Sequence, residues 1–224
     1  MKTIRNSILC LGIVLLGATL LRGQDLSKYR GFSLGASLAN VLKLSDQQLT
    51  DVKTTHARPM LIQELTWWPP SSSGVSARPG NVEQILFSFS NGELYKMSVA
   101  YDYSSTEGLT VDDMVRSISS KYGPATSVES EADTVLNKVY DQPQGPVAQW
   151  QDSQSACDLV RSPYGDRFGL VIYSKAANAD ADLATAEAVK LEEQERPDKE
   201  ANQKKKESDD LEALRLKNQK AFRP

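Results

Sequence analysis

The sequence predicts an α+β fold: two tandem units, each a helix followed by three strands, form an antiparallel sheet with the helices on one face, and a long charged helical tail follows. Three observations lead to this prediction. A short motif occurs twice, at residues 35–42 and 108–115, strand-like segments follow each copy, and the composition changes abruptly after Lys175. We therefore expect a globular domain at residues 24–175 and a tail at residues 176–224.

The N-terminal residues have the composition of an export signal. Lys2 and Arg5 precede an apolar run at residues 8–21, which is too short to span a bilayer and matches the core of a secretory signal. We expect residues 1–23 to be a signal peptide, whose removal takes three basic residues and changes the net charge from −3 to −6. The mature protein is then expected to be periplasmic or secreted, with no stable membrane insertion after cleavage.

Both copies of the motif have the residues of a helix start. The hydroxyls of Ser37 and Thr110 can accept hydrogen bonds from backbone N–H groups two or three residues further on. Asn40 and Asp113 occupy the position of the reciprocal acceptor in a capping box. An apolar stripe continues from the second copy to Tyr122, so the second helix is the better defined of the two.

Segments with the composition of strands follow each helix. Because these segments are close together in the chain and joined by turn residues, we expect antiparallel pairing within units at about residues 31–105 and 106–175. The segments lie at residues 60–68, 82–90 and 93–103 after the first helix and at residues 147–152, 155–161 and 167–174 after the second.

The Asn-Gly pair at residues 91–92 is the strongest turn signal in the chain. A two-residue turn followed by regular pairing would place the apolar residues of the two flanking strands on opposite faces. A three-residue turn pairs Phe87 with Tyr95 and Ile85 with Met97, which brings both apolar sets to one face. We therefore expect the three-residue turn and a buried face that contains Ile85, Phe87, Met97 and Val99.

The tail at residues 176–224 is rich in charge and poor in aromatic residues. It contains 10 Lys and Arg, 12 Asp and Glu, and one aromatic residue, Phe222. Its Ala, Glu, Leu and Lys residues favour helix, with an interruption expected at Pro197. The tail is either a solvated helix or a partner-binding helix with Leu211, Leu214 and Phe222 as contact residues.

The repeated order of helix and strands resembles the tandem architecture of the beta-lactamase-inhibitor proteins and of the small outer-membrane lipoproteins of the barrel-assembly machinery. The resemblance covers about residues 31–175 and implies a non-enzymatic binding role without naming a partner. The chain departs from these proteins in lacking disulfides and a lipidation cysteine. The resemblance rests on Gly35, Ser37 and Val41, on Gly108, Thr110 and Met114, and on Tyr122-Gly123-Pro124 after the second helix.

The composition argues against several kinds of chemistry. A net charge of −3 gives no electrostatic basis for nucleic-acid binding, and two cysteines with one histidine cannot supply a four-ligand Cys/His zinc site. Loss of the leader removes Cys10 and leaves Cys157, which is either buried in a strand or a reactive, cross-linking thiol. His56 has no local partner that would make it a base. We therefore predict no catalytic, cofactor-binding or metal-binding residues.

Carboxylates concentrate near the end of the first unit. Asp102, Glu107, Asp112 and Asp113 could form an acid/base pair or a calcium site, or could serve as helix caps and turn residues. A hydrolase would need two carboxyl groups that face one cleft, and Asp166 is a further candidate for such a pair.

Aromatic residues suggest a binding surface. Trp67 and Trp68 are adjacent, so a strand would point them to opposite faces, and Trp68, Tyr101 and Tyr103 are the candidates for exposure. Our first hypothesis is an exported, non-catalytic protein-interaction module of the bacterial cell envelope, which binds an envelope or secreted protein through the solvent face of its sheet. The alternatives are a carboxylate-dependent hydrolase or carbohydrate-binding protein, and a structural protein that self-associates through its tail.

Overall fold

The computed structural model describes residues 25–69, 81–128, 146–161 and 167–223. The expected signal peptide lies outside these residues.

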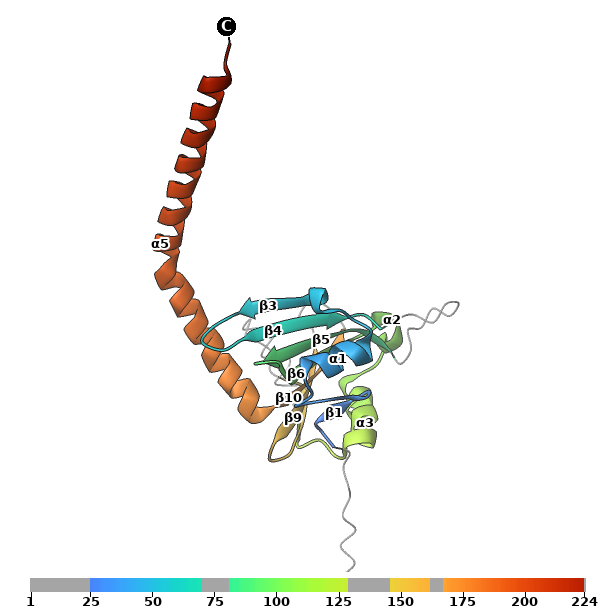
Figure 1. The fold of residues 1–224 in the computed structure, drawn as a ribbon. Coiled ribbons are helices and arrows are strands. Elements are labelled where there is room, and N and C mark those ends of the chain that lie inside the picture. Colours follow the sequence, from blue (N-terminus) through green and yellow to red (C-terminus); the bar gives the residue numbers. More distant parts are fainter. Residues whose placement is uncertain (1–24, 70–80, 129–145, 162–166, 224) are drawn as a thin grey trace, which may run out of the picture.

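Eight strands of the described residues form one antiparallel sheet in the order β3-β4-β5-β6-β10-β9-β8-β7 (Figure 1). This sheet and the long C-terminal helix confirm the predicted α+β class. The sheet contains β3 (Val52–His56), β4 (Ile62–Trp67), β5 (Val82–Ser90), β6 (Glu93–Tyr101), β7 (Ser127–Val128), β8 (Ala148–Gln151), β9 (Ser155–Arg161) and β10 (Phe168–Ser174). The other elements are the ribbon of β1 (Lys28–Tyr29) and β2 (Phe32–Ser33), the helices α1 (Leu38–Ser45), α2 (Tyr103–Thr106), α3 (Val111–Tyr122) and α5 (Lys175–Ala221), and the 3-10 turn η1 (Leu49–Asp51).

The sheet has two halves that meet at β6 and β10. Strands β3 to β6 follow α1, strands β7 to β10 follow α3, and residues 96–100 pair with residues 169–173 at the junction. Each half has one strand more than the sequence predicted, because β3 is a polar edge strand without an apolar stripe and β7 has only two residues. That the two halves are copies of one unit stays a prediction.

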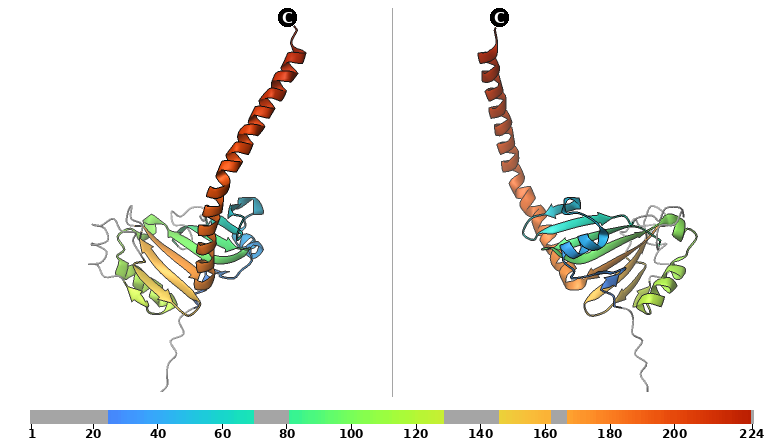
Figure 2. Two further views of the ribbon diagram at one scale, coloured as in Figure 1. Left: turned by 90° about the vertical axis from the view of Figure 1, so that its left-hand side faces the viewer. Right: turned by 45° about the vertical axis from the view of Figure 1, so that its right-hand side comes forward.

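The helices α1 and α3 and the ribbon cover one face of the sheet, while α5 lies on the other (Figure 2). On the covered face, the indole nitrogen of Trp150 donates to the carbonyl oxygen of Gly123 at 2.9 Å and so joins β8 to the end of α3. The core residues of the covering elements include Tyr29, Phe32, Val41, Met114, Ile118 and Tyr122, and those of the sheet include Leu65, Ile85, Phe87, Met97, Val99, Trp150, Leu159, Leu170 and Ile172.

The turn between β5 and β6 differs from the prediction. Ser90 pairs with Glu93, so the loop has two residues and not three. Asn91 and Gly92 both have positive φ angles, of 48° and 83°, as expected for an Asn-Gly turn that matches the twist of a hairpin. The three-residue turn was therefore the wrong prediction.

The predicted buried face is nevertheless confirmed, because a bulge supplies the extra residue. Phe89 pairs with Leu94 and Ser88 with Lys96, so Tyr95 is the additional residue of β6. Beyond it Phe87 pairs with Met97, and all four residues expected on the buried face have exposures of 3% or less. One extra residue brings the apolar residues of β5 and β6 to the same face of the sheet. The effect is the same whether the extra residue lies in the turn or in the strand.

The expected helix caps are present. Thr110 Oγ1 accepts from the backbone N–H of Asp113 at 3.2 Å, and Asp113 Oδ2 accepts from the backbone N–H of Thr110 at 3.1 Å. The Thr110 hydroxyl also donates to Asp113 Oδ2 at 2.7 Å, and this bond, together with the one from the Thr110 backbone N–H, lowers the pKa of Asp113. At α1 the Ser37 hydroxyl accepts from the backbone N–H of Asn40, but the reciprocal bond expected of Asn40 is not formed, so α1 has a single cap and no capping box.

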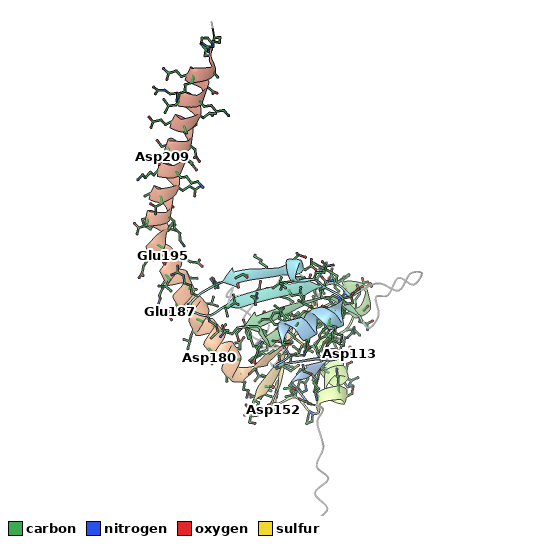
Figure 3. The ribbon with its side chains drawn as sticks, in the orientation of Figure 1. Asp113, Asp152, Asp180, Glu187, Glu195 and Asp209 are labelled. Carbon is green, nitrogen blue, oxygen red and sulfur yellow. The ribbon has the colours of Figure 1, made fainter. Side chains whose placement is uncertain are left out.

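The tail is one continuous helix, so the interruption expected at Pro197 is wrong. Pro197 lies inside α5, where it cannot donate a hydrogen bond to the carbonyl of Glu193. The helix instead bends beside Glu195, and the part beyond the bend points away from the sheet (Figure 3). A proline that removes one hydrogen bond bends a long helix without ending it.

Replacement of Trp150 by alanine should lower the free energy of unfolding by about 3–5 kcal/mol, because the indole is fully buried and its hydrogen bond to α3 is lost. Urea denaturation followed by circular dichroism measures this change. Leu44→Ala, at an exposed position of α1, should change the free energy by less than about 0.5 kcal/mol. Similar losses in both variants would contradict this assignment of the core.

Candidate functional site

The face of the sheet opposite α1 and α3, which we call the open face, contains an apolar hollow. The hollow has a volume of about 440 Å³ and is open to solvent. It lies over the central strands, away from the end of the sheet where α5 packs on Ile62 and Tyr95. Its apolar lining includes Leu86 of β5, Ala100 of β6, Val160 of β9, and Gly169 and Val171 of β10.

Gly169, which has no side chain, is one of the residues that line the hollow. A Cβ atom at this position would lie 3.0 Å from the carbonyl oxygen of Val99 and 3.1 Å from Cγ2 of Val160. Any side chain would therefore strain the contact between β10 and its two neighbours. The hollow was not predicted from the sequence, although a glycine inside an apolar strand is a recognised signal of close backbone approach.

Charged side chains border the hollow. The guanidinium of Arg161 lies 5.5 Å from the ring centre of Phe168, and Arg167 forms an ion pair with Glu83 at 3.7 Å. Both arginines line the hollow. An apolar floor beside guanidinium groups can accommodate an apolar side chain that is accompanied by a carboxylate.

The three aromatic candidates have different environments. Trp68 is 59% exposed at the end of β4, and Tyr103, at the start of α2, is 41% exposed. Tyr101 packs against the core, and burial raises its pKa well above 10.0. It therefore does not belong to an exposed surface, because alternation along β6 places it on the covered face with Met97 and Val99.

The first half of α5 is attached to the globular domain. Ala177 and Ala181 pack against Ile62 and Tyr95, while Ala184 and Ala188 are also buried. Small side chains bring this part of the helix close to the sheet. At its start, Lys175 Nζ donates to Gln151 Oε1 at 2.6 Å and to the carbonyl oxygen of Asp152 at 2.7 Å.

Ion pairs hold the helix immediately before its bend. Arg58 Nη2 lies 2.6 Å from both carboxylate oxygens of Glu195, and Lys199 Nζ lies 3.0 Å from the same carboxylate. Hydrogen bonds from these two cations lower the pKa of Glu195. Nδ1 of His56 lies 3.2 Å from Oε1 of Glu192, so the histidine has a carboxylate partner that is remote in sequence.

The second half of α5 is fully exposed. Every residue from Arg196 to Arg223 is exposed, and the 26 helical residues of this segment extend about 40 Å. Figure 3 shows this segment, on which Asp209 is labelled, extending away from the sheet. The three predicted contact residues of the tail are exposed by 51–74%: Leu211, Leu214 and Phe222.

Two of the candidate carboxylates, Asp102 and Asp113, cap helices. Asp102 Oδ1 accepts from the backbone N–H of Ser104 at 2.9 Å and caps α2, and Asp113 belongs to the capping box of α3. Glu107 follows the last residue of α2. Asp166 lies outside the described residues. Within the described part of the chain, no three His, Cys, Asp or Glu side chains are arranged to hold a metal ion.

Cys157 is buried in β9, as one of the two interpretations expected. Burial raises the pKa of its thiol to about 12, which disfavours the reactive thiolate.

Comparisons with models of protein families, with curated proteins and with solved structures give no match to this chain. Among the helices of the described residues, none combines the length and the apolar character needed to cross a bilayer.

Amide hydrogen exchange in the part of α5 next to Glu195 should be faster in the Arg58→Ala variant, because the ion pair between Arg58 and Glu195 is lost. The pKa of Glu195 is below its usual 4.5 in the folded protein. The stabilising effect of the ionised Glu195 carboxylate is therefore complete above pH 4.5 and declines as the pH falls through the lowered pKa. The difference in amide exchange rate between Arg58→Ala and the wild type should therefore become smaller as the pH falls below 4.5. Arg116→Ala, at an exposed position of α3, should leave exchange in α5 unchanged, and an equal effect of both variants would contradict the attachment.

Cys157 of the mature protein should resist a maleimide at pH 8 and react rapidly in denaturant, because the folded thiol is buried and protonated. The unfolded thiol ionises near its usual pKa of 9.0, so ionisation of Cys157 should favour unfolding as the pH rises from 9.0 toward about 12. Mass spectrometry measures the labelling. Rapid modification of the folded protein would contradict the buried position.

Proposed function

We propose that this protein is an exported, non-catalytic interaction module of the bacterial cell envelope that binds a protein partner through its open face. The observation that carries the proposal is the solvent-open apolar hollow over the central strands. A concave, mostly apolar surface with a few polar groups at its border is characteristic of binding sites. Export rests on the composition of residues 1–23.

The chemistry of the hollow defines the kind of partner. Burial of one leucine-sized or aromatic side chain against Leu86 and Val171 contributes about 1.5–3 kcal/mol. Arg167 is 61% exposed, so it can also contact a carboxylate on the partner while it remains close to Glu83. The expected ligand is therefore a protein segment in which an apolar side chain lies next to Asp or Glu.

The rigid position of the hollow favours specific binding. Apart from Arg167, its lining residues belong to strands, and the central strands β6 and β10 have neighbours on both sides. Little conformational entropy is lost when a ligand binds to such a surface. Trp68 is available for a further aromatic contact at the end of β4.

A random peptide library displayed on phage tests the proposal with the purified mature protein as the target. We expect enrichment of peptides in which an aromatic or aliphatic residue lies beside Asp or Glu. Isothermal titration with a synthetic enriched peptide should show loss of binding in Val171→Asp, which places a charge on the apolar floor. Arg167→Glu, at the exposed border, should weaken binding about tenfold.

The matched control is Leu183→Asp, which makes the same kind of change at an exposed position of α5 outside the hollow. It should bind the peptide as tightly as the wild type. Thermal denaturation verifies the folding of Val171→Asp, and Arg167→Glu tests the site without altering the apolar floor. The absence of any enriched peptide family, or equal binding by all variants, would overturn the proposal.

A further inference from the structure

The exposed end of α5 carries a regular pattern that its contacts within the chain do not explain. Leu211, Leu214, Asn218 and Ala221 follow one another at spacings of three and four residues, so they lie along one side of the helix. The same spacing continues backward through Glu207 and Lys204. Every one of these residues is exposed. We call this set of six residues the tail seam.

We propose that the tail seam binds the tail seam of a second copy of this chain in antiparallel orientation. The proposal is independent of ligand binding at the open face. It goes beyond the proposed function because it assigns a second interaction surface and its occupant. The paired segment covers residues 201–222, which is about three heptads.

The core layers of such a pair follow from its two-fold symmetry. Leu211 packs against the partner's Leu214, and symmetry repeats this contact, so two adjacent leucine layers form the centre. On either side of the centre, the carboxylate of Glu207 lies opposite the side-chain amide of the partner's Asn218. Further out, the methylene groups of Lys204 lie opposite the partner's Ala221.

The charges of the tail seam favour the antiparallel orientation. A parallel pair would match Asn218 favourably with the partner's Asn218, but it would place Lys204 opposite the partner's Lys204 and Glu207 opposite the partner's Glu207. Two core layers would then each bring two like charges together away from water, which makes the parallel pair unfavourable. The antiparallel arrangement separates both pairs of like charges.

The positions that flank the tail seam add contacts in the same orientation. Asp210 lies beside the partner's Lys217, so the two-fold axis produces two ion pairs of opposite charge. Phe222, which follows the last residue of α5 and is 74% exposed, lies beside the partner's Ala201. The acidic and basic positions of the segment therefore complement each other, and its exposed aromatic side chain gains an apolar neighbour.

The antiparallel pair places the two globular domains at opposite ends of the joined helices, because each α5 leads away from its own sheet (Figure 2). Both hollows remain accessible in the dimer. A dimer of this form would present two open faces and could engage two ligands at once.

Sedimentation equilibrium of the mature full-length chain over a range of concentrations tests the pairing. We expect a reversible monomer–dimer equilibrium. The double variant Leu211→Asp/Leu214→Asp should weaken dimerisation about a hundredfold or more, because both leucine layers are lost. Leu183→Asp, at an exposed leucine in the first half of α5, is the matched control and should dimerise like the wild type. A wild type that is monomeric throughout would overturn the proposal, even if its tail bound vesicles of anionic lipid.

Disulfide trapping tests the orientation. In the antiparallel pair, K204C and A221C of two copies lie opposite each other, so the double variant K204C/A221C should form covalent dimers under mild oxidation. The single variant A221C should form few, because the two introduced thiols lie far apart. The native Cys157 is buried and should not contribute. Equal cross-linking of the single and double variants would indicate a parallel pair and contradict the proposal.

Discussion

Pairing between β6 and β10 joins the two halves of the sheet. It connects residues 96–100 with residues 169–173, which are far apart in the chain, and makes the core beneath the two halves continuous. Without this pairing each half would end in a long unpaired edge, which promotes aggregation. The same junction determines the position of both proposed interaction surfaces. The hollow lies over β6 and β10, and α5 begins directly after β10, so the end of a central strand sets the starting point of the tail.

Local signals predicted much of the fold. The capping box at Thr110 and Asp113 fixed the start of α3, because both partners lie within one turn of helix. The face that contains Phe87 and Met97 was predictable from alternation, whereas the position of the extra residue was not. A bulge at Tyr95 and a longer turn restore the same face, so the apolar pattern cannot distinguish them. The pairing of β6 with β10 leaves no local signal either.

The candidate surfaces were predictable only where exposure follows from composition. The exposed leucines of the tail lie in a segment dominated by charged residues. Tyr101 was misplaced because its chemistry suits a surface and a core equally well, and only the register of β6 puts it on the covered face. The hollow depends on Gly169 and on residues from several strands that come together through non-local pairing. The sequence of any single strand therefore gives little indication of the hollow.

Amide hydrogen exchange across the whole sheet is the most direct test of this account. If β6 and β10 hold one continuous sheet together, their ladder amides should exchange only through global unfolding, with the same free energy as the inner strands β5 and β9. That free energy should equal the value from denaturant unfolding. Exchange of β8, β9 and β10 at a distinctly lower free energy than β4, β5 and β6 would show that the halves unfold separately and would contradict the central role of the junction.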